Sequence, residues 1–112
     1  MSITLRFVDL AEGRALNRGY RGKDAPTNVL AFVYDDMSVG DIVLCAPLLR
    51  REAYEQEKAL EAHCAHLVVH GMLHLQGYDH QRGSEAARME AREVAILAAL
   101  GLANPYLQNA RR

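Results

Sequence analysis

The chain has 112 residues, of which 50% are hydrophobic and 24% charged, and its formal net charge is −1. A domain of this length buries a core without disulfides or a structural metal, and a charge near zero does not by itself indicate a nucleic-acid partner. No apolar run reaches the roughly 18 residues of a membrane span, and the N-terminus lacks signal-peptide features. We therefore expect a cytoplasmic protein with a single domain over residues 1–112 and reduced cysteines at Cys45 and Cys64.

The first half of the chain predicts three strands and one short helix. Ile3, Leu5 and Phe7 alternate with polar residues, which is the period-two pattern of a half-buried strand. Two later apolar runs contain β-branched residues and are separated by a polar turn, which predicts a hairpin. The expected elements are a strand over residues 3–7, a short helix from residue 10 that ends near residues 17–20, a loop over 21–27, strands over 29–34 and 41–45, and a turn over 35–40.

The second half of the chain predicts two helices. Residues 53–76 contain few helix breakers, and Gly77 is placed to end this long helix. Ser84 is placed to cap a final helix that ends near Gly101. With the strands, these helices predict an α+β fold, a small sheet of about three strands packed on helices. The apolar stripe expected on the long helix consists of Leu60, Cys64, Leu67, Gly71 and Leu75, and that of the final helix of Met89, Ile96, Leu97 and Leu100.

Three histidines near the end of the long helix have the spacing of metal ligands. His70 and His74 are four residues apart, so their side chains share one helix face, about 6 Å apart along the axis. Gly77 can adopt positive φ, which lets the chain bend and return His80 toward the other two. Three imidazoles leave a fourth position open for water, as in catalytic zinc sites. The spacing therefore predicts one metal ion, and three histidines suit nickel or copper as well as zinc. A lone histidine in a helix would instead be typical of an ordinary core or surface residue.

The same stretch matches the zinc-protease pattern H-E-x-x-H-x-x-G-x-x-H except at one position. Gly71 stands where those proteases place the glutamate that serves as general base. The metal ligands are retained while the usual base is absent, which disfavours peptide hydrolysis. We expect Gly71 to allow close packing of the helix on the sheet, and close approach of a substrate to the metal is the less favoured interpretation.

Other polar residues near the histidines are candidates for supporting roles. His66 lies one helical turn before His70, so it could support that ligand or form a wall of the cleft. We favour a third interpretation, in which His66 is an ordinary packed residue. His63 is expected to be a core residue. Asp79 is placed to orient a ligand imidazole and is equally typical of an ordinary turn residue.

Positive charge is concentrated in the first 23 residues. Five Lys and Arg residues there stand against Asp9 and Glu12, which gives a local balance of +3. Such a field can steer a polyanion toward the protein. Each of Arg6, Arg14 and Arg18 is, taken alone, more typical of an ordinary surface residue.

Several stretches resemble one known family. HGMLHLQGYDH (70–80) closely resembles the signature of the YbeY family of bacterial endoribonucleases, and LNRGYRGKDAPTNVLAF (16–32) resembles the second signature of that family. GDIVLC (40–45), the helix at 84–101 and NPY (104–106) also follow the family pattern. The resemblance covers nearly the whole chain in order.

The resemblance implies a metal-dependent, single-strand-specific endoribonuclease that acts in rRNA processing, in particular 16S rRNA 3′-end maturation, and in ribosome quality control. It implies zinc as the cofactor, held by His70, His74 and His80, and the 16S rRNA precursor and small ribosomal subunit as partners. Arg21 matches the conserved arginine of the family and, with His70, is an implied catalytic residue. Its guanidinium can clamp a phosphate through two parallel hydrogen bonds. Lys23 would add a second positive group, unless it is an ordinary solvated loop lysine.

The chain also departs from the family pattern. Members usually carry an extra helix and strand before the segment that matches ITLRFVD, whereas this chain begins there. We therefore expect an exposed edge strand, which favours a homo-oligomer formed by pairing with a second copy. Two other function classes stay open: a metalloprotease-like peptide hydrolase, and a ribosome-associated binding factor with a structural zinc.

Overall fold

The computed structural model describes residues 2–34, 39–78 and 83–107. Its sheet contains β1 (Ser2–Val8), β2 (Val29–Val33) and β3 (Val39–Cys45). The strand order is β1-β3-β2, with β1 parallel to β3 and β2 antiparallel to it. The predicted hairpin is therefore confirmed, and the parallel β1–β3 pair requires the chain to cross over between β1 and the hairpin.

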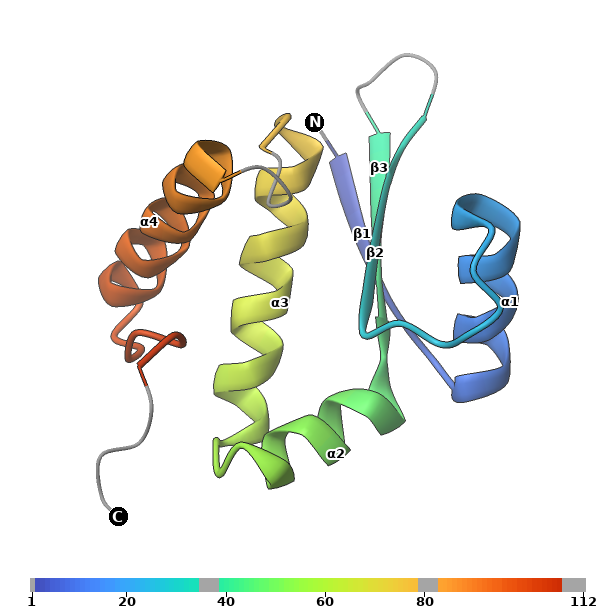
Figure 1. The fold of residues 1–112 in the computed structure, drawn as a ribbon, viewed down its shortest axis with the longest axis horizontal. Helices are drawn as coiled ribbons and strands as arrows, with labels where there is room; N and C mark the ends of the chain where they lie inside the picture. The colour runs from blue at the N-terminus through green and yellow to red at the C-terminus, as the bar shows by residue number, and fades with distance from the viewer. Residues whose placement is uncertain (1, 35–38, 79–82, 108–112) are drawn as a thin grey trace.

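The described residues also form four helices, which are α1 (Leu10–Arg21), α2 (Ala46–Glu55), α3 (Leu60–Leu75) and α4 (Gly83–Ala99). In Figure 1, α1 lies on one side of the sheet and α3 on the other, and α4 lies beyond α3. α2 joins the end of β3 to the start of α3. The α+β class predicted from the sequence is confirmed, and α3 forms a middle layer between the sheet and α4.

Apolar side chains fill all three interfaces between these layers. The predicted stripe of α3 is buried in its later part, but Leu60 at its start is exposed. α3 also has a second apolar face, toward α4, which the single predicted stripe does not include. The cluster on the α1 side of the sheet contains Val8, Leu30, Val43, Cys45 and Leu48, the sheet–α3 cluster contains Ile42, Leu44, Leu49, Leu67 and Leu75, and the α3–α4 cluster contains Val69, Leu73, Met89 and Leu97.

The single long helix predicted over residues 53–76 is wrong, because the chain breaks between α2 and α3. Glu57 adopts a left-handed conformation with φ of 56°. The amide of Lys58 donates to the carbonyl of Ala53 over 2.9 Å, and the amide of Glu57 donates to that of Tyr54. This pattern closes a helix end that is usually built with glycine, so the sequence carries no local signal for it. Because of this break, α3 runs in a different direction from α2 (Figure 1).

The end of α3 agrees with the prediction. Gly77 has φ of 98°, and its amide donates to the carbonyl of His74. The amide of Tyr78 donates to the carbonyl of Leu73, and the Tyr78 side chain packs on the same apolar cluster as Leu73. Both orphan carbonyls at the helix end are thereby satisfied. Gly77 thus turns the chain away from α3 directly after His74.

The ends of two other helices can be compared with the predictions. α1 ends at Arg21, one residue past the predicted end near residues 17–20, and Gly22 with φ of 70° follows it. Asn17 near this end is buried, and its side-chain amide donates to the carbonyl of Ala25 in the loop that follows. Ser84 is not the cap of the last helix, because α4 already begins at Gly83.

β1 is an outer strand of the described sheet and pairs with β3 alone. Leu5 and Phe7 on this strand are exposed, at 47% and 58%. The predicted pairing with a second copy stays a prediction. No helix in the described part of the chain is long and apolar enough to cross a membrane.

Candidate active site

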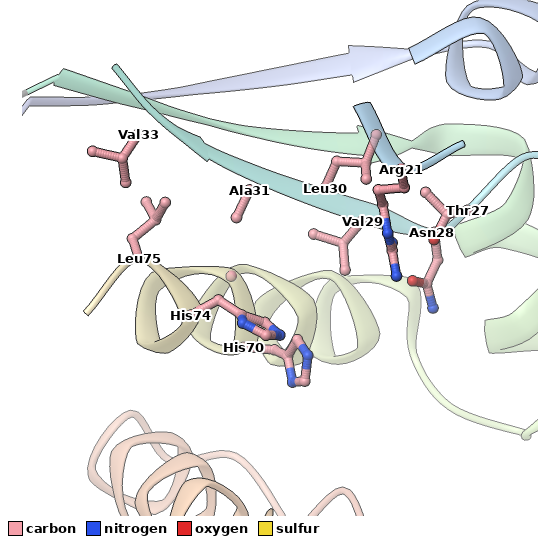
Figure 2. A pocket seen from close by; sticks show the side chains of 11 residues that line it. Arg21, Thr27, Asn28, Val29, Leu30, Ala31, Val33, His70, His74 and Leu75 are labelled. Atoms are coloured by element: carbon pink, nitrogen blue, oxygen red, sulfur yellow. The ribbon is translucent and has the colours of Figure 1, made fainter. Parts of the chain in front are cut away.

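A cleft of about 490 Å³ lies between β2 and α3. One wall is the strand itself, and the other is the C-terminal half of α3 (Figure 2). One end is lined by Arg21, the last residue of α1, together with the two residues that precede β2. The lining residues are Arg21, Thr27, Asn28, Val29, Leu30, Ala31, Val33, His70, Gly71, His74 and Leu75. An open cleft with apolar walls and a few polar groups is typical of a binding site.

His70 and His74 lie one turn apart on α3 and both line this cleft. Their ring centroids are 5.0 Å apart and the ring planes are inclined by 75°. Two imidazoles at this separation can both reach an ion at the roughly 2.0–2.1 Å of a zinc–nitrogen bond. The geometry and the nitrogen donors fit two ligands of the predicted zinc site.

The third predicted ligand, His80, and the predicted supporting residue Asp79 lie outside the described residues. Among residues 2–34, 39–78 and 83–107, no group of three or more His, Cys, Asp or Glu side chains is arranged to hold a metal ion. The chain leaves α3 through Gly77 with positive φ, the conformation on which the prediction of His80 depended.

Arg21 is brought to the cleft by the way α1 ends and the following loop is held. The side-chain amide of Asn17 donates to the carbonyl of Ala25 over 2.7 Å, and Arg14 donates to both carboxylate oxygens of Asp24 at 2.7 and 2.9 Å. The Arg14 guanidinium holds the pKa of Asp24 below its ordinary value. Figure 2 shows the Arg21 side chain beside Thr27 at the start of β2.

The other predicted basic residues lie elsewhere. Arg6 pairs with Glu12 at 2.9 Å, and Arg14 and Arg18 lie within 2.7 and 3.8 Å of Asp24. Each of these three arginines is therefore partly neutralised by a carboxylate. Lys23 is exposed and is not among the residues that line the cleft. Within the described residues Arg21 is the one cation that lines the cleft, and it forms no ion pair there.

Gly71 packs directly on the sheet. A Cβ atom at this position would lie 3.2 Å from two side-chain carbons of Ile42, closer than ordinary van der Waals contact. The favoured interpretation from the sequence, close packing of helix on sheet, agrees with this contact. A side chain at this position would require Ile42, which is completely buried, to give way by a few tenths of an ångström.

On the opposite side of α3, a fully buried carboxylate contacts two of the histidines. Oε2 of Glu93, on α4, lies 2.6 Å from Nδ1 of His70. Oε1 lies 3.0 Å from Nε2 of His66 and also accepts a hydrogen bond from the hydroxyl of Tyr106. His66 is therefore part of this cluster, which we call the Glu93 cluster (His66, His70, Glu93 and Tyr106).

The environment of Glu93 favours the ionised carboxylate. Burial raises the pKa of Glu93, but hydrogen bonds from His66, His70 and Tyr106 outweigh it and lower the pKa to about 2. Burial, followed by the hydrogen bond to Glu93, raises the pKa of Tyr106 above its ordinary value. An ionised carboxylate only accepts hydrogen bonds, so Nδ1 of His70 and Nε2 of His66 are the donors.

A second buried pair lies near the other end of α3. Nε2 of His63 lies 2.8 Å from Oε1 of Glu52 on α2, and the side-chain amide of Asn28 donates to the same carboxylate at 3.3 and 3.4 Å. His63 is buried, as the sequence predicts for a core residue. Through Asn28, which lines the cleft, this pair supports one wall of the site.

Glu93 and Tyr106 were not predicted from the sequence. A signal for Glu93 was present, since it lies four residues after Met89 and four before Leu97, in the middle of the buried stripe of α4. A carboxylate inside an apolar stripe is rarely buried without a partner. Tyr106 lies beyond the last helix, and no periodicity indicates its direction.

Comparisons with known proteins agree on one family. The family described as Endoribonuclease YbeY matches residues 1–101 of the chain. A curated relative with that description from Aromatoleum aromaticum is 61% identical over 106 residues, which cover 93% of this chain and 69% of the relative. Another, from Janthinobacterium sp., is 59% identical over 110 residues, covering 94% and 72%. The solution structure of a Thermotoga maritima protein is similar with a TM-score of 0.57 and 27% identity, and covers 98% of this chain and 78% of that one.

Proposed function

The chain belongs to the endoribonuclease YbeY family, and from this premise we propose that it is a zinc-dependent endoribonuclease that cleaves single-stranded RNA. We place its activity in rRNA processing, at the 3′ end of 16S rRNA, and in ribosome quality control. The observation that carries the proposal is that Arg21, His70 and His74, from two distant parts of the chain, line one cleft.

The zinc ion would be held by His70, His74 and His80. A bound zinc supplies a Lewis acid and lowers the pKa of a coordinated water toward about 7. The residues of the chain would then perform two tasks: the histidines fix the metal at one wall of the cleft, and the cleft orients the RNA strand beside it. Gly71, which leaves no glutamate at the protease position, favours RNA over peptide as the substrate.

Arg21 would bind the phosphate at the end of the cleft that it lines together with Thr27 and Asn28. Its planar guanidinium donates two parallel hydrogen bonds to a phosphate, and its charge stabilises the additional negative charge of the transition state. Arg21 suits this role better than the arginines near it, because those already contact carboxylates in the described part of the chain. A cleft of about 490 Å³ has the size of a small-ligand site, which favours unpaired nucleotides over a duplex.

The proposed partners are the 16S rRNA precursor and the small ribosomal subunit, in the cytoplasm. Family membership supports these partners, together with the local excess of positive charge in the first 23 residues. Much of that charge is paired, so we expect a modest electrostatic contribution to RNA affinity.

The experiment that tests this function is incubation of the purified protein with a labelled RNA that has single-stranded and duplex segments, and separately with casein, each with and without a chelator. We expect cleavage of the single-stranded RNA that the chelator abolishes and added zinc restores. Cleavage of casein would instead support the peptide hydrolase. No cleavage of either substrate, with a melting temperature lowered by the chelator, would support a binding factor with a structural zinc.

Two variants separate the metal from the phosphate contact in the same assay. His74→Ala should lose both zinc and RNA cleavage while the protein stays folded, and stoichiometric zinc in this variant would overturn the metal assignment. Arg21→Ala should keep zinc and lose cleavage, with Arg92→Ala on the exposed face of α4 as the matched control. Wild-type cleavage by Arg21→Ala would exclude the phosphate role.

A further inference from the structure

The Glu93 cluster connects a residue of the cleft to a carboxylate that the proposed reaction does not use. Glu93 has no exposed surface, whereas His70 is partly exposed and lines the cleft. The two are linked by the contact of 2.6 Å between Nδ1 and Oε2. His70 therefore has one ring nitrogen committed to the interior of the protein, on the side of α4.

This contact selects one of the two neutral forms of the imidazole. A carboxylate accepts hydrogen bonds, so the proton of neutral His70 resides on Nδ1. The lone pair is then on Nε2, and this is the nitrogen through which His70 would bind a metal ion. In known metal sites a histidine ligand commonly donates its other N–H to a carboxylate, which fixes both tautomer and ring orientation.

Glu93 is itself held in place by the other members of the cluster. Oε1 is occupied by His66 and by the hydroxyl of Tyr106, which directs Oε2 toward His70. The segment that carries Tyr106 is anchored in turn, since the ammonium group of Lys58 donates to the carbonyl of Pro105 over 2.9 Å. The Asn104 side chain also accepts a hydrogen bond from the amide of Tyr106.

We propose that Glu93, held by Tyr106 and His66, is a positioning residue that keeps His70 protonated on Nδ1 and presents Nε2 to zinc. This proposal extends the proposed function and rests on it in one respect, because both require a bound metal ion. Glu93 touches no substrate in this scheme, and its effect passes through His70 alone.

The first test is made on the metal-free wild-type protein and does not depend on any variant. Two-dimensional ¹⁵N–¹H spectra of the histidine rings distinguish a protonated Nδ1 from a protonated Nε2, and His70→Gln assigns the signal. We expect His70 as the form with the proton on Nδ1. A His70 ring protonated mainly on Nε2 would overturn the proposal. Because no zinc is present, this result stands even if the protein proves to be no nuclease.

The second test measures zinc affinity by competition with a chromophoric chelator. Glu93→Gln keeps the size of the side chain but brings a donor group into the cluster, so we expect affinity to fall about 10- to 100-fold and the tautomer signal of His70 to shift. Glu61→Gln, an exposed carboxylate in the first turn of α3, is the matched control and should match wild type.

The outcomes separate the two proposals. Unchanged zinc affinity and unchanged tautomer in Glu93→Gln would overturn the positioning role while leaving the zinc nuclease intact. A wild-type protein that binds no zinc would overturn the proposed function and the presentation of Nε2 to zinc, while the tautomer would still decide whether Glu93 keeps His70 protonated on Nδ1. If Glu93→Gln does not fold, the spectrum of the wild-type protein remains the deciding measurement.

Discussion

Two glutamates from neighbouring helices contact histidines of α3, and the two sites differ in whether the histidine also lines the cleft. Glu52 contacts His63, which is buried between α2 and α3, and it also holds Asn28. Glu93 contacts His66 and His70, and His70 is open to the cleft. The Glu52–His63 pair joins two helices and a loop, and the Glu93 cluster connects the interior to a candidate metal ligand.

The difference shows that a His–Glu contact does not by itself indicate chemistry. The His63–Glu52 contact of 2.8 Å is as short as many in active sites, but His63 is buried in the core of the protein. We infer a functional role for the contact at His70 because His70 itself lines the cleft that Arg21 also lines. The surroundings of the histidine decide between a structural and a functional role.

The largest expected effect comes from removing one histidine of each pair. His70→Ala should lower RNA cleavage by about 100-fold or more, the scale expected for a catalytic group. His63→Ala should leave cleavage per folded molecule within a fewfold of wild type. It should lower the free energy of unfolding by about 1–3 kcal/mol, since Glu52 loses its partner. The rate of cleavage of labelled single-stranded RNA and urea unfolding measure the two quantities.

The comparison would fail if His63→Ala abolished cleavage while remaining fully folded. In that case the Glu52 pair would act on the site through Asn28, and both ends of α3 would be functional. Equal loss of stability in both variants with no loss of cleavage would instead make both pairs structural.

A smaller effect is expected from changing the carboxylate of the first pair. Glu52→Ala leaves His63 buried without a hydrogen-bond acceptor, so we expect a loss of about 1–3 kcal/mol in unfolding free energy and unchanged zinc affinity. Glu55→Ala, an exposed residue on the same helix, controls for the loss of a helical carboxylate. A drop in zinc affinity in Glu52→Ala comparable to that of Glu93→Gln would remove the distinction between the two pairs.

The sequence predicts those features of the fold that depend on local spacing. The alternation at Ile3, Leu5 and Phe7 identifies β1, and the four-residue spacing of His70 and His74 places both on one side of α3. Gly77 is identified as a helix end because positive φ strongly favours glycine. Each of these inferences uses residues within one strand or one or two helical turns.

The features that were missed depend on contacts between distant segments or on backbone strain without a signature residue. Glu93 meets His70 only because α4 folds back along α3, and 23 positions separate them in the chain. The break at Glu57 uses a glutamate where glycine is usual, so propensity favours one continuous helix.

The smallest effect is expected from Tyr106→Phe, which removes one hydroxyl from the Glu93 cluster and leaves the histidines in place. Glu93 would keep its contacts to His66 and His70, and loss of a single hydrogen bond typically costs about 0.5–1.5 kcal/mol of unfolding free energy. We expect zinc affinity to fall only a fewfold, because Oε2 still faces His70. Chemical unfolding and chelator competition measure both changes, with Tyr54→Phe as an exposed control. A loss of zinc affinity as large as that in Glu93→Gln would mean that Tyr106, rather than burial between the helices, sets the position of the carboxylate.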